Sequence, residues 1–162
     1  MAGTDAARVT ALRDVRDFLG CKRLALVGVS RRERHFSRAM LREFKRRGYD
    51  MVPVNPNATE VEGQPCCRRL QDITPTVEGA LLMTPHALTN AVVRDCLEAG
   101  IKLVWMYRAK GRGALSMSAV RFCRSTGIRV IAGHCPYMFW QDSGLFHHLH
   151  GFLLKLGKSY PR

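Results

Sequence analysis

The residues best suited to ligand chemistry close the apolar run 24–29 and follow it directly: Gly28, Val29, Ser30, Arg31 and Arg32. A glycine lets the backbone turn tightly and approach a ligand closely. Backbone N–H groups, a serine hydroxyl and guanidinium groups all donate hydrogen bonds to phosphate oxygens. A helix beginning near Ser37 would add a favourable dipole. This stretch therefore predicts a phosphate-binding loop.

The charge of the chain supports an anionic ligand. The formal net charge is +13, and from Lys22 to Arg47 ten lysines and arginines are opposed only by Glu33 and Glu43. Such an excess favours nucleic acid, anionic lipid or a polyphosphate ligand. A solvated basic surface would show the same composition. The charge narrows the class of partner and says little about the fold.

The loop must be positioned by the elements around it. The 162 residues, 46% of them hydrophobic, suit one domain over 1–162. Five short apolar runs alternate with helical patterns, at 24–29, 50–54, 79–83, 102–107 and 128–132. The order predicts a three-layer α/β fold with a Rossmann-like, doubly wound parallel sheet of about five strands.

The helices follow from apolar periodicity and from glycine stops. They are expected at 5–19, 37–47, 84–99 and 114–126, with a helical extension at 140–157 around a core of 22–136. Thr84 suits the N-cap of the third of these helices, and Pro85 suits its first position. The segment 57–77, with two prolines, is expected to be loop rather than helix.

In such a sheet the ligand crevice lies at the carboxyl ends of the strands. A dinucleotide such as NAD would require G-x-G-x-x-G after the first strand and an acidic residue after the second. The chain has only Gly28 in the first stretch and Asn55 at the second position, so both tests fail. NADP is less excluded, because arginine can accept a 2′-phosphate. Coenzyme A fits, because it carries a diphosphate and a ribose 3′-phosphate.

The motifs V-G-x-S-R, V-P-V-N-P and a closing C-P, in this order over residues 22–140, resemble the small bacterial CoA-binding proteins. That family is related to the N-terminal domain of the succinyl-CoA synthetase α subunit. The resemblance implies a Rossmann-like fold and coenzyme A or an acyl-CoA as ligand. The positions that match its binding site are Gly28, Val29, Ser30, Arg31, Val54, Asn55, Pro56, Thr84, Pro85 and Trp105.

The resemblance also suggests what these positions do. Val54, Asn55 and Pro56 would lie along the nucleotide, and Thr84 and Pro85 near the diphosphate or the pantetheine arm. Trp105 stands at an aromatic position that either lines the pocket or belongs to the core. Arg32 and Ser37 join the expected site because they complete the basic loop and open the helix after it.

A catalytic role would depend on Cys135, which stands between His134 and Pro136. A neighbouring imidazolium lowers the pKa of a thiol, and the thiolate is the nucleophile. The alternative is a structural turn that closes the last strand. His147, His148 and His150 suggest a metal site only if a third ligand joins them. No nucleophile, base and orienting group stand together, so a non-catalytic binding protein is expected over an acyl-transfer or thiol-transfer enzyme.

The remaining expectations concern location and partners. The first 20 residues lack the early apolar core of a signal peptide, and no apolar run has the length of a membrane span. A cytoplasmic, basic, nucleotide-binding protein is therefore expected. Nucleic-acid binding stays as an alternative, although no helix-turn-helix, zinc finger or stacking motif is present. The terminal helices are candidates for contact with a second copy or a partner protein.

Overall fold

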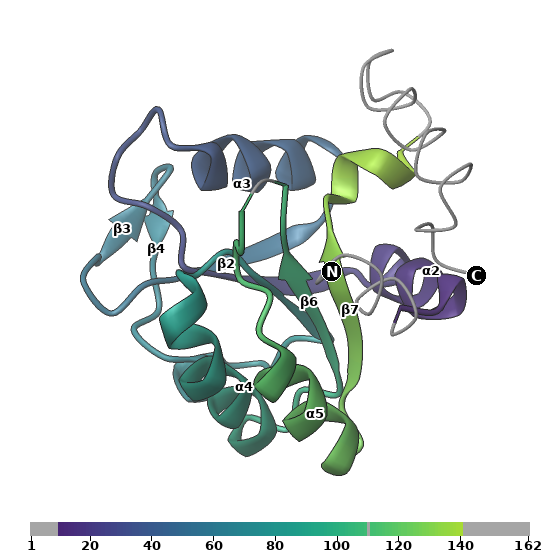
Figure 1. The fold of residues 1–162 in the computed structure, drawn as a ribbon. Helices are drawn as coiled ribbons and strands as arrows, with labels where there is room; N and C mark the ends of the chain where they lie inside the picture. Colours follow the sequence, from purple (N-terminus) through teal and green to yellow (C-terminus); the bar gives the residue numbers. More distant parts are fainter. Residues whose placement is uncertain (1–9, 110, 141–162) are drawn as a thin grey trace.

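A computed structural model describes residues 10–109 and 111–140, which form an α/β domain around one parallel sheet (Figure 1). The strand order is β2-β1-β5-β6-β7, and every pairing in it is parallel. The strands are β1 (Arg23–Val27), β2 (Asp50–Val54), β5 (Gly79–Leu82), β6 (Leu103–Tyr107) and β7 (Arg129–His134). The sheet confirms the predicted Rossmann-like, doubly wound α/β fold.

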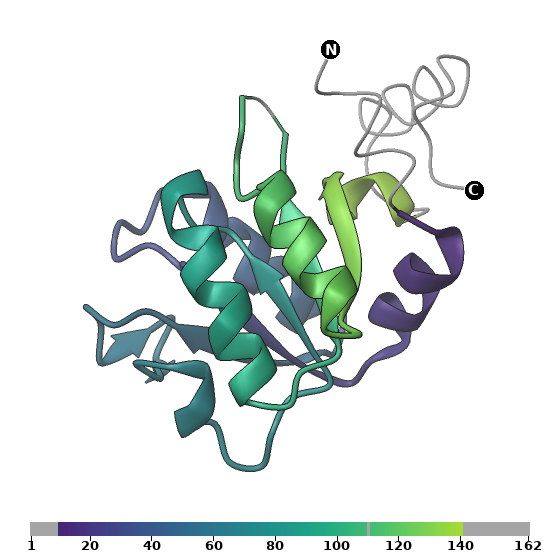
Figure 2. The ribbon, with the colours of Figure 1, turned by 60° about the horizontal axis from the view of Figure 1, so that its bottom comes forward.

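Helices cover both faces of the sheet, as Figure 1 and Figure 2 show. One face packs on α2 (Leu12–Gly20), α3 (Phe36–Arg46) and the 3₁₀ turn η3 (Pro136–Phe139). The other packs on α4 (Thr89–Glu98) and α5 (Met117–Ser125). The strands alternate between the two cores, so that Trp105 faces α2 and α3 while Val104 faces α4 and α5. Burial on both faces explains why these strands are continuously apolar.

The connection from β2 to β5 contains no α-helix, as expected, but it does contain a hairpin. The short strands β3 (Glu60–Val61) and β4 (Gln64–Pro65) pair antiparallel, and a 3₁₀ turn η1 (Leu70–Asp72) follows. Figure 1 shows the hairpin beside the first turns of α3. Neither strand is long enough to produce a sequence pattern, which is why the hairpin was not predicted.

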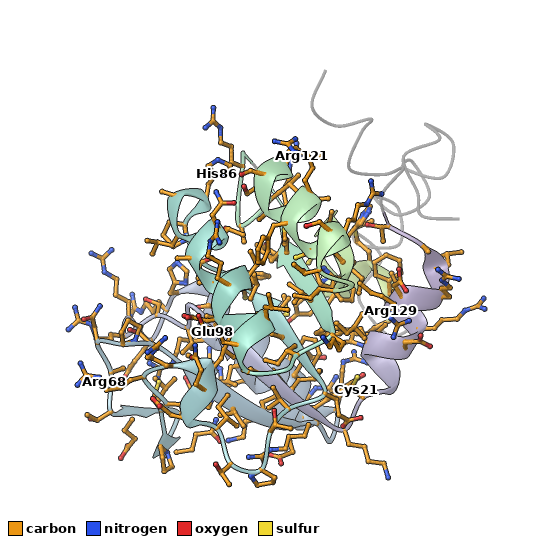
Figure 3. All side chains as sticks on the ribbon, turned by 90° about the horizontal axis from the view of Figure 1, so that it is seen from below. Cys21, Arg68, His86, Glu98, Arg121 and Arg129 are labelled. Atoms are coloured by element: carbon orange, nitrogen blue, oxygen red, sulfur yellow. The ribbon has the colours of Figure 1, made fainter. Side chains whose placement is uncertain are left out.

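Both edges of the sheet are occupied by short segments. At β7, the Thr10 hydroxyl accepts the Ala132 N–H at 2.8 Å and lies 3.5 Å from the Ala132 carbonyl oxygen. Arg129, also on β7, pairs with Asp14 and Asp17 of α2 (Figure 3). At β2, Cys67 donates its N–H to Pro53 and accepts the N–H of Asn55.

Three predicted helices begin later than expected. α5 begins at Met117, after its N-cap Ser116, and not at residue 114. Pro85 is followed by a 3₁₀ turn, η2 (His86–Leu88), and α4 begins only at Thr89. Thr84 is therefore not a helix cap: it is buried, with its hydroxyl 3.5 Å from that of Thr89. The helix expected at 5–19 begins at Leu12 within the described part, and residues 1–9 lie outside that part. Apart from Trp140, the expected extension at 140–157 also lies outside it. No helix in the described part has both the length and the apolar character of a membrane span.

Candidate functional site

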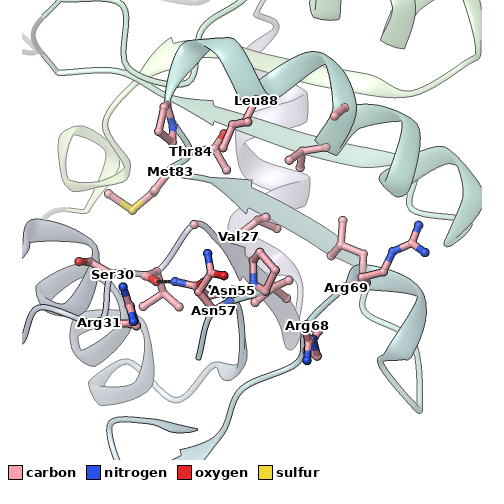
Figure 4. Close-up of a pocket in the computed structure, with 18 of the residues that line it drawn as sticks. Val27, Ser30, Arg31, Asn55, Asn57, Arg68, Arg69, Met83, Thr84 and Leu88 are labelled. Carbon is pink, nitrogen blue, oxygen red and sulfur yellow. Dashed lines mark hydrogen bonds between the residues drawn. The ribbon is translucent and has the colours of Figure 1, made fainter. Parts of the chain in front are cut away.

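A cavity of about 970 Å³ opens at the carboxyl ends of β1, β2 and β5 (Figure 4). Its walls come from the loop after β1, the end of β2, the segment before η1, the end of β5 and the first part of α4. The predicted residues that line it are Gly28, Val29, Ser30, Arg31, Arg32, Val54, Asn55, Pro56, Thr84 and Pro85. Ten of the twelve candidate residues thus come together from three strand ends.

Gly28 lets the first loop pass against the end of β5. Its φ is +87°, in the left-handed region, and its N–H donates to the Val54 carbonyl at 3.0 Å. A Cβ at this position would stand 2.9 Å from the Met83 carbonyl carbon and the Thr84 nitrogen. These are backbone atoms, which cannot move aside as a flexible side chain can. The glycine is therefore required both by conformation and by space.

The amides of this loop are less available to a ligand than the sequence suggests. Gly28 N–H bonds Val54, Ser30 N–H bonds the Ser37 hydroxyl at 2.9 Å, and Arg32 N–H bonds the Ser30 hydroxyl at 3.1 Å. Within the stretch 28–32, the amides of Val29 and Arg31 have no such acceptor in the described structure, and the same holds for Glu33 and Arg34 further along the loop. Ser37 is fully buried and lies outside the cavity, so it holds the loop instead of lining the site.

Asn55 occupies the position where an NAD-binding protein carries an acidic residue. Its Nδ2 donates to the Val29 carbonyl at 2.7 Å, and its Oδ1 accepts the Asn57 N–H at 2.8 Å. The first bond needs a donor, which a carboxylate does not have. Asn55 thus joins the β1 loop to the end of β2, and no carboxylate stands there for a ribose diol.

The cavity carries unneutralised positive charge. Arg31 lies on one side and Arg68 on another (Figure 4), and Arg32 also lines the cavity. None of the three forms an ion pair with any residue that the structure describes. The one carboxylate lining the described cavity, Asp95, already pairs with Arg69 at 3.2 Å. Such a site favours a ligand with several negative charges.

The sequence reading missed the contribution of the segment before η1. Arg68, Arg69 and Leu70 reach the cavity because Cys67 is bonded to the end of β2. The adjacent arginines were a usable signal, but nothing local places them near Gly28. Arg38 was also missed: it lies behind the loop and donates to the Ser30 carbonyl.

Trp105 lies away from the cavity, so the expectation that it lines the site is not met. Its ring is fully buried against Phe18, and its Nε1 donates to the His134 carbonyl at 2.9 Å. The alternation along β6 directs this side chain toward α2 and α3. The alternative that it belongs to the core describes its placement.

The end of β7 offers no reactive thiolate. Cys135 is only 6% exposed, and burial raises the pKa of its thiol to about 11. Burial, with a smaller contribution from the charge of Arg108, lowers the pKa of His134 to about 4. Near pH 7 the thiol is protonated and the imidazole is neutral, so His134 does not activate Cys135.

No group of three metal-ligating side chains occurs within 10–109 and 111–140. The histidines considered as metal ligands, at 147, 148 and 150, lie outside those ranges.

Comparisons with known proteins agree with this geometry. The ADP-forming acetate–CoA ligase of Methanocaldococcus jannaschii is 22% identical over 118 residues, which are 70% of this chain and 17% of the ligase. A second such ligase, from Archaeoglobus fulgidus, is 30% identical over 91 residues, or 55% of this chain and 14% of the ligase. The chain spans less than a fifth of the length of these archaeal relatives.

Solved structures share the fold over larger fractions. A hypothetical protein from Pyrococcus horikoshii OT3 has a TM-score of 0.72 and 25% identity, covering 87% of this chain and 92% of that one. The dinucleotide-forming acetyl-coenzyme A synthetase 1 of Ca. Korarchaeum cryptofilum has a TM-score of 0.59 and 27% identity, covering 67% of this chain and 25% of that one. The family profile described as "CoA binding domain" matches residues 22–141, most of the chain. The chain therefore belongs to the CoA binding domain family and has coenzyme A as its ligand.

Proposed function

We propose that the protein holds coenzyme A or an acyl-CoA in the cavity at β1, β2 and β5, and that it acts as a non-catalytic binding or regulatory protein. The observation that carries this proposal is a group of arginines around the cavity, Arg31, Arg32 and Arg68, that form no ion pair with the residues the structure describes. Three such cations suit the diphosphate and 3′-phosphate of coenzyme A better than the two phosphates of NAD.

The proposed placement follows the chemistry of the walls. The arginines, the Ser30 hydroxyl and the amides of Val29 and Arg31 would hold phosphate oxygens. The end of β2, with Val54, Asn55 and Pro56, would form the seat of the nucleotide. The remaining wall is largely apolar, with Met83, Thr84, Pro85, Leu88 and Val92, and suits the pantetheine arm.

The side chains around the loop support a binding role over a catalytic one. The Ser30 hydroxyl accepts the Arg32 N–H, and His35 Nδ1 accepts the Ser37 N–H at 3.2 Å. These groups hold the loop and the start of α3, and no hydrogen bond joins Ser30 to His35 within the described part. The serine hydroxyl that does lie beside His35 Nδ1, at 2.9 Å, is that of Ser37, which is fully buried outside the cavity. A catalytic serine needs a base within hydrogen-bond reach. The ligase activity in the names of the relatives is not proposed for this chain, which matches only a small part of them.

Calorimetric titration with coenzyme A tests the proposal, with dephospho-CoA, NADP and a short single-stranded DNA as competitors. We expect a dissociation constant on the order of 1 μM, weaker binding of dephospho-CoA, and little competition by DNA. Arg31→Ala and Arg68→Ala should each weaken binding about tenfold, because a charge-assisted phosphate contact is lost. Arg121→Ala, on an exposed part of α5, is the matched control and should bind as the native protein does. Absence of coenzyme A binding by folded protein would overturn the proposal, and tight DNA binding would favour the nucleic-acid alternative.

We also propose that the protein is located in the cytoplasm. All six cysteines are unpaired, and Cys96 of α4 and Cys123 of α5 are fully buried in the core between these helices and the sheet. Reduced thiols are typical of proteins in a reducing cytoplasm. Thiol titration of protein purified without reductant would test this: six thiols are expected after denaturation, and fewer would argue for an oxidising compartment.

A further inference from the structure

The turn of the β3–β4 hairpin contains a glutamate in an unusual conformation. Glu62 has a φ of +53°, and Gly63 after it has a φ of +69°. The two residues connect the paired positions Val61 and Gln64, so the turn has the positive φ values of a type I′ turn. Asn, Asp and Gly are the usual residues there, because left-handed backbone is unfavourable for a longer side chain. A residue that breaks the local preference calls for a compensating contact.

The Glu62 carboxylate makes that contact with α3. Its Oε1 accepts from Arg38 Nε at 2.6 Å and from Arg42 Nη1 at 2.7 Å. The hairpin that presents it is anchored, because Val61 is buried in the core and Gln64 Nε2 donates to the Met51 carbonyl at 3.1 Å. The carboxylate therefore projects from a fixed base toward the first turn of α3.

Arg38 connects this carboxylate to the cavity loop. Its side chain is only 10% exposed, and its Nη1 donates to the carbonyls of Ser30 at 3.3 Å and Arg31 at 3.5 Å. The Ser30 carbonyl and the Arg31 N–H belong to one trans peptide group, so they point in opposite directions. By holding the carbonyl toward itself, Arg38 directs the Arg31 N–H away from α3. Together with the Val29 amide, this N–H is one of the two in the stretch 28–32 that are left for a ligand.

We propose that Glu62 is a positioning residue for the phosphates of coenzyme A, acting through Arg38 on the backbone of the β1 loop. The inference rests on the proposed function, because it assumes that this loop binds phosphate. Without its carboxylate partner, the nearly buried guanidinium of Arg38 would be free to turn toward solvent or toward the ligand. Either movement releases the Ser30 carbonyl and the orientation of the Arg31 amide.

The charges of the cluster support this arrangement. Burial alone would raise the pKa of Glu62, but the hydrogen bond and charge of Arg38, together with the charge of Arg42, lower it overall. Glu62 is therefore ionised at neutral pH. Arg42 shares the same carboxylate, but its side chain is 50% exposed and no hydrogen bond joins it to the loop in the described residues. Arg42 is thus a natural control for the general effect of the ion pair.

The decisive variant is Glu62→Asn, because asparagine suits the left-handed turn while its shorter side chain lacks the carboxylate. We expect it to weaken coenzyme A binding about tenfold while the melting temperature stays near that of the native protein. Arg42→Ala should bind as the native protein does. In an Arg38→Met background, Glu62→Asn should cause no further loss, because its effect passes through Arg38. If Arg38→Met does not fold, Arg38→Lys replaces it. Lysine keeps the positive charge, but it has one nitrogen, whereas Arg38 uses Nε for Glu62 and Nη1 for the two carbonyls.

The outcomes separate this inference from the function on which it rests. Native affinity in Glu62→Asn, or independent additive losses in the double variant, would overturn the role of Glu62 and leave coenzyme A binding intact. No coenzyme A binding by the native protein would instead overturn the proposed function. A fall in melting temperature equal in Glu62→Asn and Arg42→Ala, with equal losses of affinity, would show a merely structural ion pair.

Discussion

The carboxyl ends of β1 and β7 have similar sequences but different surroundings, and we call them the open end and the closed end. Each strand is apolar and runs into a glycine with a positive φ, Gly28 at +87° and Gly133 at +80°. After Gly28 the chain continues into exposed arginines, and a cavity opens there. After Gly133 come buried His134 and Cys135, and the aromatic residues of η3 close over them. Position at a strand end therefore offers a site, but the residues that follow decide whether a ligand can reach it.

The largest expected effect tests the open end. Gly28→Ala should lower the free energy of unfolding by about 3 kcal/mol, because left-handed strain adds to a backbone contact that cannot relax. It should also abolish coenzyme A binding. Gly48→Ala is the control: its φ of +89° is nearly the same, but a Cβ there meets no atom within 4 Å. The control should lose about 1 kcal/mol in urea unfolding. Equal losses would show that the contact with β5 is unimportant.

The next effect tests the closed end through pH. His134 has a pKa of about 4 in the folded protein, against an ordinary value of 6.5, because burial disfavours the charged imidazole. The unfolded chain therefore binds the proton more tightly. The contribution of His134 to the free energy of unfolding should be fully present above pH 6.5. It should fall by about 3 kcal/mol as the pH drops to 4.

The variant His134→Leu isolates this contribution. It removes the titrating group from a site where the buried Nε2 has no hydrogen-bond partner in the described structure. Urea unfolding at pH 7 and pH 4 should show a smaller acid loss than in the native protein. An equal loss of unfolding free energy at pH 4 in both proteins would mean that His134 can be protonated in the folded state. The end of β7 would then be open to solvent.

The smallest effect is an expected lack of change. Cys135→Ala should alter coenzyme A affinity less than about twofold, because Cys135 lies outside the cavity. Its thiol, with a pKa of about 11, should react slowly with iodoacetamide at pH 8, and the half-buried Cys67 should be modified first. Mass spectrometry of tryptic peptides after short labelling would measure the order. Early labelling of Cys135, or loss of binding in Cys135→Ala, would support the thiol-transfer alternative.

The fold was largely predictable from the sequence, because buried strands between helices leave long apolar patterns. The expected second strand, 50–54, matches β2 at both ends. The loop at Gly28 was predictable as well, since a glycine followed by serine and arginines is a local feature. The strand pattern and the composition of this loop depend only on residues that are adjacent in the chain, so they can be identified from the sequence.

The rest depends on contacts between distant residues. Nothing near Ser37 indicates that its hydroxyl accepts the Ser30 N–H, and nothing near Trp105 indicates which core its ring joins. Glu62 and Arg38 are 24 positions apart and meet only because a hairpin folds back onto α3. Directions of side chains and partners of loop amides are tertiary properties, so the sequence predicted the ligand class better than the contacts.

The Thr10 hydroxyl at Ala132 has a consequence for how copies of this protein meet. An open edge strand exposes unpaired N–H and C=O groups, which invite strand-to-strand aggregation. The Thr10 hydroxyl occupies both groups of Ala132. On the opposite edge, the backbone N–H and carbonyl of Cys67 bond Pro53 and Asn55 at the end of β2. Removing the residues before α2, which include Thr10, would therefore expose the unpaired backbone groups of β7. The purified protein should then aggregate at concentrations where the native chain stays dispersed.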